Sequence, residues 1–571
     1  MRILLLCSSF NGLTQRAWLE LRRAGHDVLV ELAVSPEAMT EAAELAKPDV
    51  IICPFLKERV PSELWRNHRT VIIHPGPPGD RGPSSLDWAI TDGESEWGVT
   101  ALQAVEEMDA GPIWGYRTFP MPLSAHGEAP RKSALYNGPV ADAAAELVME
   151  VAAKAGDASF VPEPLDYRSP EVRGRLRRAM RHSDREFSWE EPTEDILRRV
   201  RAADGAPGGR VSLCEQPVRV FDVYRGPDLT GTPGRVAARR EGAVLVHTGD
   251  GSIWVGHVRL EQEGAIKLPA TMALGELVAE VPQRSGYSEI TYDRSEGVGV
   301  VSFDFYNGAM STEQCRRLSS ALRYAASQDT RVLVVRGGEV FSNGIHLNVI
   351  EASRHPELEA WMNINAINAV CREIVGCSSQ LVVTSIGGNA GAGGVMMGLG
   401  ADRVIIRDSV VLNPHYRTMG LFGSEYWTYV LPRRVGGEHA RRLTSQALPI
   451  GAADAVECGL ADKALAGTRL DFERRVLEYA ERLAADPGYD RLLTGRRQVR
   501  EVDERRKPLD AYRAEELAEM SRDMFDDRGG FRQARRDFVQ KVKATATPEH
   551  LARHRELSGA SATAGADASH M

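Results

Sequence analysis

Strands and helices alternate along the first 120 residues, and this alternation limits the fold more than any other feature of the chain. Amphipathic stretches at Thr14–Ala24 and Ser35–Ala46 predict helices. The predicted strands between and around them are Ile3–Cys7, Asp27–Leu32, Val50–Cys53 and Val71–Ile73. This order predicts an α/β fold with a doubly wound parallel sheet. The first turn, Ser8–Gly12, lacks the GxGxxG spacing of a dinucleotide site.

The rest of the chain divides into segments of different character. A small OB-like β-barrel is predicted by close β-runs at Val218–Val223, Gly234–Ala238, Ala243–His247 and Ser252–Val258. A second α/β region follows, with a helix at Ser311–Ser327 and strands at Val298–Phe303, Arg331–Val335, Leu381–Ile386 and Arg403–Arg407. The chain is charged and helical from Leu470, and its Ala/Gly/Ser-rich end predicts disorder. We therefore expect the segments 1–180, 181–285, 286–470, 471–545 and a disordered tail, 546–571.

Composition excludes several classes of function. The net charge of −9 is spread along the chain, which has no basic stretch for nucleic acid. No apolar stretch reaches membrane-spanning length, and the run after Met1 is too short for a signal peptide. The seven cysteines show no CxxC spacing, which favours buried thiols in a reducing compartment. We expect a cytoplasmic protein that binds neither nucleic acid nor membrane and has no metal site.

A histidine stands where the fourth predicted strand ends. His74 begins a loop with three glycines and four prolines over ten residues, at the edge of the sheet where α/β proteins bind ligands. Asp109 ends a second candidate strand. A histidine oriented by a carboxylate can transfer protons or stabilise an oxyanion. From the residues alone, a loop-capping histidine and a structural ion pair remain alternatives.

Segment 71–90 resembles the signature of formyltransferases that use 10-formyltetrahydrofolate, such as those acting on methionyl-tRNA and glycinamide ribonucleotide. Met108–Pro112 resembles a second loop of the same family. The resemblance implies that His74 polarises the formyl oxygen and that Asp109 orients it and shuttles protons. Arg81 and Gly82 would belong to the formyl-folate loop. Ile72 stands where the family has a catalytic Asn, so an amide donor worth about 3 kcal/mol is missing.

The barrel segment resembles the C-terminal barrel of methionyl-tRNA formyltransferase over residues 185–280. In that family the barrel helps to bind tRNA. Here the segment shows no enrichment of basic and aromatic residues. A structural spacer is therefore the favoured interpretation.

Two glycine-rich loops follow strands in the second half of the chain, Glu339–Leu347 and Ile386–Met396. Such loops let backbone N–H groups approach a ligand oxygen, although each alone is also typical of a tight turn. Together with Ala401–Arg403 they resemble the crotonase (enoyl-CoA hydratase/isomerase) superfamily over residues 290–470. The resemblance implies that the N–H groups of Ile345 and Gly393 form an oxyanion hole for a coenzyme A thioester. The residues assigned to CoA binding are Phe341, Gly344 and Gly394.

The acids that hydratases use are absent. Met396 occupies the first glutamate position, and His415 or Tyr416 falls at the second. Hydration of an enoyl thioester is therefore not expected. Tyr416 and Glu425 lie on the loop that carries catalysis in this family, and we predict that they act as acid and base. The other interpretation is a core phenol and a carboxylate at a helix start.

The order formyltransferase, barrel, crotonase resembles the HypX (HoxX) family of [NiFe]-hydrogenase maturation proteins. That resemblance implies formyl transfer from 10-formyltetrahydrofolate to coenzyme A, followed by decarbonylation of formyl-CoA to supply CO to the active-site iron. The expected partners are these two small molecules and hydrogenase maturation proteins. A thiolate acceptor is a stronger nucleophile than an amine, which would account for Ile72. The alternatives are an amine-directed formyltransferase with an acyl-CoA-binding crotonase domain, and a non-catalytic maturation scaffold.

Overall fold

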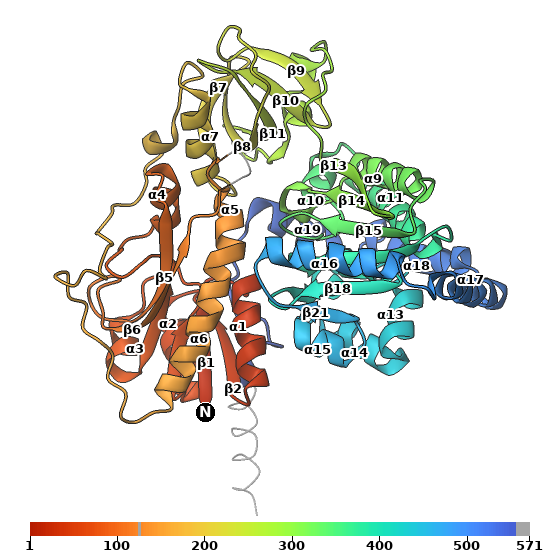
Figure 1. The fold of residues 1–571 in the computed structure, drawn as a ribbon. Helices are drawn as coiled ribbons and strands as arrows, with labels where there is room; N and C mark the ends of the chain where they lie inside the picture. Colours follow the sequence, from red (N-terminus) through yellow and green to blue (C-terminus); the bar gives the residue numbers. More distant parts are fainter. Residues whose placement is uncertain (124–126, 556–571) are drawn as a thin grey trace, which may run out of the picture. The chain divides into compact units, whose positions relative to one another are not determined.

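A computed structural model describes residues 1–123 and 127–555, which form two units (Figure 1). The first contains residues 1–287 and the segment that begins at Lys543. The second contains residues 288–542. Among the described residues, no helix is both long enough and apolar enough to cross a membrane.

The first unit begins with a six-stranded sheet in the order β2-β1-β3-β4-β5-β6. Its strands are β1 (Arg2–Cys7), β2 (Asp27–Leu32), β3 (Val50–Cys53), β4 (Thr70–His74), β5 (Glu96–Gln103) and β6 (Ile113–Pro120). β1 to β4 are parallel, whereas β5 and β6 run antiparallel to their neighbours. The sheet is thus mixed, while the sequence predicted a parallel one. β1 and β3 are buried almost throughout, as expected for strands covered on both faces.

The helices of this sheet begin where the sequence supplies caps. Asn11 accepts a hydrogen bond from the Thr14 amide, and Ser35 accepts one from the Ala38 amide. The helices are α1 (Gly12–Arg23), α2 (Pro36–Ala46), α3 (Ser62–Asn67), α4 (Ser85–Thr91), α5 (Lys132–Leu135) and α6 (Ala141–Ala155).

A smaller antiparallel sheet follows, in the order β7-β8-β11-β10-β9, with β12 paired to β11. It has its own apolar core, to which helix α7 (Thr193–Ala202) contributes Ile196, Leu197 and Val200. Its elements are β7 (Gly209–Leu213), β8 (Gln216–Arg225), β9 (Val236–Arg240), β10 (Ala243–His247), β11 (Ser252–Leu260), β12 (Leu268–Pro269) and α8 (Ala270–Leu274).

The second unit contains a six-stranded sheet in the order β13-β14-β15-β16-β18-β21 and a small sheet in the order β17-β19-β20. β14, β15, β16, β18 and β21 are parallel. The strands are β13 (Ile290–Ser295), β14 (Val298–Phe303), β15 (Val332–Gly337), β16 (Leu381–Ile386), β17 (Ala390–Gly391), β18 (Arg403–Arg407), β19 (Val411–Asn413), β20 (Ile450–Gly451) and β21 (Lys463–Leu465).

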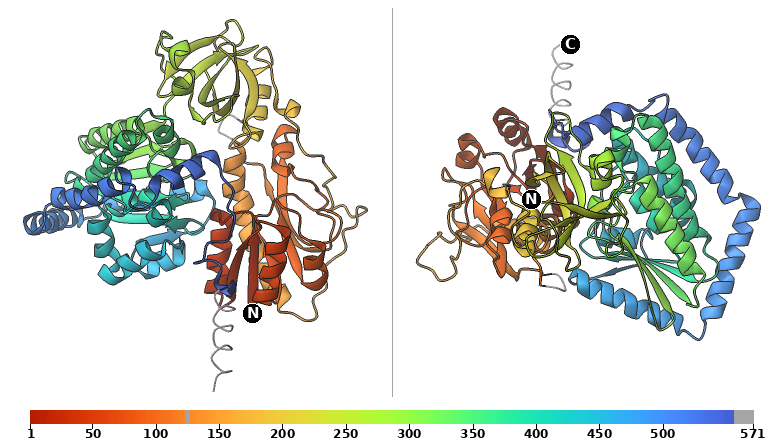
Figure 2. Two further views of the ribbon diagram at one scale, coloured as in Figure 1. Left: turned by 180° about the vertical axis from the view of Figure 1, so that it is seen from behind. Right: turned by 90° about the horizontal axis from the view of Figure 1, so that it is seen from above.

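Helices cover this sheet and continue around the outside of the unit (Figure 2). Ser311 and Gln314 form a reciprocal cap at the start of α9. The helices are α9 (Thr312–Ala326), α10 (Leu347–Ala352), α11 (Pro356–Gly376), α12 (Gly393–Leu399), α13 (Trp427–Val435), α14 (Gly437–Gln446), α15 (Ala452–Glu457), α16 (Arg469–Ala484), α17 (Tyr489–Arg506), α18 (Leu509–Met524) and α19 (Phe531–Gln540).

The end of the chain differs from its prediction. The sequence placed residues 546–555 in a disordered tail, but Leu551, Ala552 and His554 are buried. They pack in the first unit, where the Leu32 amide donates to Thr547 Oγ1 and His554 Nε2 lies 2.8 Å from a Glu31 oxygen. Burial of these groups accounts for the order of the segment. The rest of the predicted tail, 556–571, lies outside the described residues.

Candidate active sites

His74 is the last residue of β4, and the loop after it is firmly held. Ser85 Oγ and Trp97 Nε1 both donate to the Pro75 carbonyl, and Thr100 Oγ1 donates to the Gly76 carbonyl. His74 and Thr100 are also direct partners across β4 and β5. The loop is therefore a fixed structure, as its glycines and prolines predicted.

The predicted pair of His74 and Asp109 is present. His74 Nδ1 lies 3.6 Å from Asp109 Oδ2, which accepts a hydrogen bond from the Gly82 amide. Arg81 donates to the Met108 carbonyl and pairs with Glu107, so it joins the two loops. Asp109 has a φ of 53°, a left-handed conformation that is uncommon for a non-glycine residue.

A second carboxylate, which sequence reasoning missed as a partner, contacts the same ring. Asp80 Oδ2 lies 2.9 Å from His74 Nε2, and both side chains are buried. Burial opposes protonation of the imidazole, but the Asp80 hydrogen bond and the Asp109 charge together raise the pKa of His74 above its ordinary value. The signal available in the sequence was an acid six residues beyond the histidine in a compact loop.

Ile72 lies two residues before His74 on β4, so both side chains point to the same face of the sheet. Like Leu56 and Trp65, it is partly buried and packs against an apolar cluster of the first sheet. The position of the missing amide donor is therefore an apolar wall.

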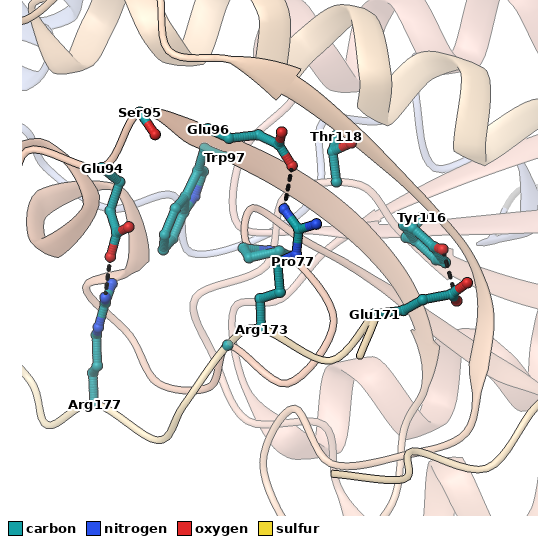
Figure 3. A pocket seen from close by; sticks show the side chains of 11 residues that line it. Pro77, Glu94, Ser95, Glu96, Trp97, Tyr116, Thr118, Glu171, Arg173 and Arg177 are labelled. Atoms are coloured by element: carbon teal, nitrogen blue, oxygen red, sulfur yellow. Dashed lines mark hydrogen bonds and ion pairs between the residues drawn. The ribbon is translucent and has the colours of Figure 1, made fainter. Parts of the chain in front are cut away.

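A cavity of about 300 Å³ lies beside this loop, but His74, Asp109 and Arg81 do not line it (Figure 3). Pro77 and Arg177 do, together with Trp97 and Tyr116. The cavity walls hold charged groups in ion pairs with one another, Arg173 with Glu96 and Arg177 with Glu94.

In the second unit the two glycine-rich loops meet. A methyl group built on Gly344 would lie 3.4 Å from the Gly393 nitrogen. Within the part of the chain that the structure describes, the Ile345 and Gly393 N–H groups donate to no protein acceptor. Two free N–H groups on adjoining loops fit the predicted oxyanion hole.

Tyr416 and Glu425 form a buried pair at this position. The Tyr416 hydroxyl donates to Glu425 Oε2 over 2.8 Å. The other carboxylate oxygen is so close to Gly393 that a methyl group there would lie 2.1 Å from it. Burial raises the pKa of Glu425 to about 7, and burial together with Glu425 raises the pKa of Tyr416 well above its ordinary value. The pair thus offers a neutral acid and a base that titrates near neutral pH.

The loop that carries Glu425 is held by two residues that sequence reasoning did not select. Asn368 on α11 accepts from the Glu425 amide, and Glu516 on α18 accepts from the Tyr426 and Thr428 amides. Glu425 and Tyr426 have φ values of 61° and 58°. Such backbone strain persists only where the surroundings enforce it.

The remaining predicted residues differ in their placement. Phe341 is fully buried and its ring packs 5.6 Å from that of Phe303, so its side chain belongs to the core rather than to a CoA-binding face. Gly394 approaches the backbone of Ser342 so closely that no side chain fits. Met396 is buried in the core.

His415 lies beside Gly391, two residues before Gly393. Its Nδ1 lies 2.7 Å from the Asn413 carbonyl, and a methyl group on Gly391 would lie 2.9 Å from its Cε1. Burial lowers the pKa of His415. The ring is therefore neutral, with its proton on Nδ1.

Among the described residues, no group of three or more His, Cys, Asp and Glu side chains could hold a metal ion.

Comparison with known proteins matches this division of the chain. The formyl transferase family matches residues 23–120, the formyl transferase C-terminal domain residues 179–273, and the enoyl-CoA hydratase/isomerase family residues 293–532. Methionyl-tRNA formyltransferase from Roseiflexus castenholzii is 28% identical over 254 residues, which are 43% of this chain and 77% of that protein.

Two relatives span nearly the whole chain. The hydrogenase maturation factor HoxX of Bradyrhizobium diazoefficiens is 43% identical over 560 residues, 97% of each protein. The crystal structure of HypX from Aquifex aeolicus in complex with tetrahydrofolic acid has a TM-score of 0.93 at 40% identity, covering 97% of this chain and 99% of that chain. The chain belongs to the HoxX/HypX family of hydrogenase maturation factors, with formyltransferase and crotonase domains.

Proposed function

We propose that this chain transfers a formyl group from 10-formyltetrahydrofolate to coenzyme A, and then decarbonylates formyl-CoA to supply the CO ligand of a [NiFe]-hydrogenase. The observation that carries the proposal is the Tyr416–Glu425 pair beside Gly393. The tetrahydrofolic acid named in the complex with Aquifex aeolicus HypX supports the choice of donor.

In the first step the coenzyme A sulfur attacks the formyl carbon. A C–S bond forms, the C–N bond of the formyl-folate breaks, and the thiol proton ends on the folate nitrogen. His74 stabilises the oxyanion of the tetrahedral intermediate, and Asp109 beside His74 Nδ1 assists the proton transfer. Ile72 removes a neutral donor from this site, and a thiolate, being a strong nucleophile, tolerates that loss better than an amine.

In the second step the formyl proton leaves to Glu425, the C–H electron pair remains on carbon as CO forms, and the C–S pair leaves with sulfur. Tyr416 protonates the departing thiolate. The 2.8 Å hydrogen bond then returns the proton from Glu425 to Tyr416, so the site is restored without a net change. The N–H groups of Ile345 and Gly393 hold the thioester carbonyl during this step. Gly344 and Gly394 keep the backbone open for coenzyme A.

The test is CO capture by a haem protein, with purified chain, 10-formyltetrahydrofolate and coenzyme A. We expect the wild-type chain to release CO. We expect Tyr416→Phe to lose CO release by at least about 100-fold, while mass spectrometry still finds formyl-CoA. Tyr324→Phe is the matched control, because Tyr324 is an exposed tyrosine of α9.

Other outcomes would replace the proposal. Equal loss of both steps in Tyr416→Phe would end this division of labour. A formylated amine without formyl-CoA would identify an amine-directed formyltransferase. Full hydrogenase maturation in cells that carry His74→Ala would point to a scaffold.

A further inference from the structure

The His74 ring meets its two carboxylates unequally. Nε2 lies at hydrogen-bond distance from Asp80, 2.9 Å, whereas Nδ1 lies 3.6 Å from Asp109, beyond a hydrogen bond. The first contact fixes the ring within the protein. The second is too long for a hydrogen bond, so Asp109 does not occupy Nδ1 and this nitrogen can bond to another group.

We propose that Asp80 is a positioning residue of the formyl-transfer site, which holds His74 through Nε2 so that Nδ1 meets the formyl oxygen beside Asp109. The inference deepens the proposed formyl transfer and rests on it. A carboxylate that engages one imidazole nitrogen decides which nitrogen is available for chemistry.

The contact between His74 and Asp80 is built into the loop. Asp80 is 1% exposed. A methyl group on Gly76 would lie 2.3 Å from Asp80 Oδ2 and 2.7 Å from His74 Nε2, so only glycine permits the pair. The Asp80 amide donates to the Pro77 carbonyl, which closes the turn that presents the carboxylate.

A later segment of the first unit, residues 172–177, clamps the same loop. The Gly174 amide donates to the Pro78 carbonyl, and the Arg81 amide donates to the Arg175 carbonyl. Gly174 is also required sterically, since a methyl group there would lie 1.8 Å from the Asp80 nitrogen. The segment therefore holds the backbone on both sides of Asp80 in place.

Arg177 places a positive charge next to the Asp80 carboxylate, on the oxygen that does not contact His74. Its Nη1 lies 3.8 Å from Asp80 Oδ1, its side chain is 10% exposed, and its guanidinium stacks 5.3 Å from the Trp97 ring. Glu94 holds the other end of the guanidinium at 2.8 Å (Figure 3). The charged groups that face His74 are thus Asp80 and Asp109, with Arg177 behind the first.

Histidine NMR and kinetics together test the proposal. In protein with ¹⁵N-labelled histidine, we expect Asp80→Asn to lower the pKa of His74 and to change the protonation pattern of its two nitrogens. We expect kcat for formyl-CoA formation to fall about 10- to 100-fold, with KM for the formyl-folate little changed. The high-pH limb of the rate profile should move to lower pH, because a protonated His74 is lost earlier. Asp166→Asn, at an exposed loop, is the control.

Gly76→Ala is a second variant that keeps every ionisable group and only drives the pair apart. It should reproduce the change in His74 protonation, with thermal melting used to check that both variants fold. An unaltered His74 titration and unaltered kcat in both variants would overturn the proposal. If the wild-type chain forms no formyl-CoA, the proposed function fails, and the NMR titration alone then decides the role of Asp80.

Discussion

Glu425 and Glu516 are two buried carboxyl groups in one hydrogen-bond network, and burial raises the pKa of each to about 7. Their surroundings differ. Glu516 accepts from the Tyr426 amide, the Thr428 amide and hydroxyl, and Ser424 Oγ. Glu425 accepts from Tyr416 and the Ser424 amide. The negative charge is therefore better accommodated on Glu516, and that charge helps to raise the pKa of Glu425.

This pair yields a pH prediction with a definite sign. As a base, Glu425 works when ionised, so decarbonylation should rise as pH passes its pKa. Glu516→Gln removes the neighbouring negative charge and lowers that pKa, so CO release from formyl-CoA should extend to lower pH. Glu519→Gln, on the same helix but with a side chain that is 31% exposed, should leave the pH profile unchanged. If the pH profile of Glu516→Gln moves to higher pH or does not move, Glu516 does not carry the negative charge that raises the pKa of Glu425.

At the scale of elements, the sequence predicted the features that are local. Apolar runs located β1 to β4 and also β14, β15, β16 and β18. The turn signals placed His74 at a strand end and Gly393 in a loop that follows β16. Contacts between distant segments could not be predicted this way. Glu516 lies 91 residues beyond Glu425 on a charged helix, and only packing of α18 against the Glu425 loop reveals it. The long helix α11 was not predicted either, because its apolar residues follow the helical period only weakly. The contact of its Asn368 with the Glu425 amide could therefore not be predicted.

The close approach of α12 to the Glu425 loop gives an element-scale prediction. Gly393→Ala places a methyl group 2.1 Å from Glu425 Oε1, which must move away from the oxyanion hole. We expect CO release to fall about 100-fold or more, whereas formyl-CoA formation by the first unit should continue. Gly437→Ala is the matched control, because nothing lies within 4 Å of that added methyl group. Equal CO release by both variants would show that the close contact between Gly393 and Glu425 is not needed for decarbonylation.

At the scale of the whole molecule, the chain leaves the first unit after residue 287 and returns to it at residue 543. Ion pairs hold this last segment against β2, where Glu31 pairs with both His554 and Arg555. Composition suggested disorder here, because the end of the chain is rich in Ala, Gly and Ser and shows no apolar periodicity. What orders it is a buried acid more than 500 residues earlier in the sequence, which no local pattern reveals.

The Leu32 amide reports directly on this return, since its acceptor is Thr547 Oγ1. His554→Ala leaves Glu31 buried with one partner fewer, so the opening free energy of the segment should fall by about 1–3 kcal/mol. Hydrogen exchange at the Leu32 amide should accelerate accordingly. His550→Ala, at an exposed histidine of the same segment, should not change the exchange rate.

The same contact gives a pH prediction. Burial opposes ionisation of Glu31, but its hydrogen bonds to His554 and Arg555 lower the pKa of Glu31 below the ordinary value. The contact therefore stabilises the segment fully at pH values above the ordinary carboxyl pKa. This stabilisation is lost as the pH falls through the lowered pKa of Glu31 in the folded chain. Exchange at Leu32 should rise in acid in the wild-type chain, and a rate insensitive to both the substitution and acid would show that the segment is held by other contacts.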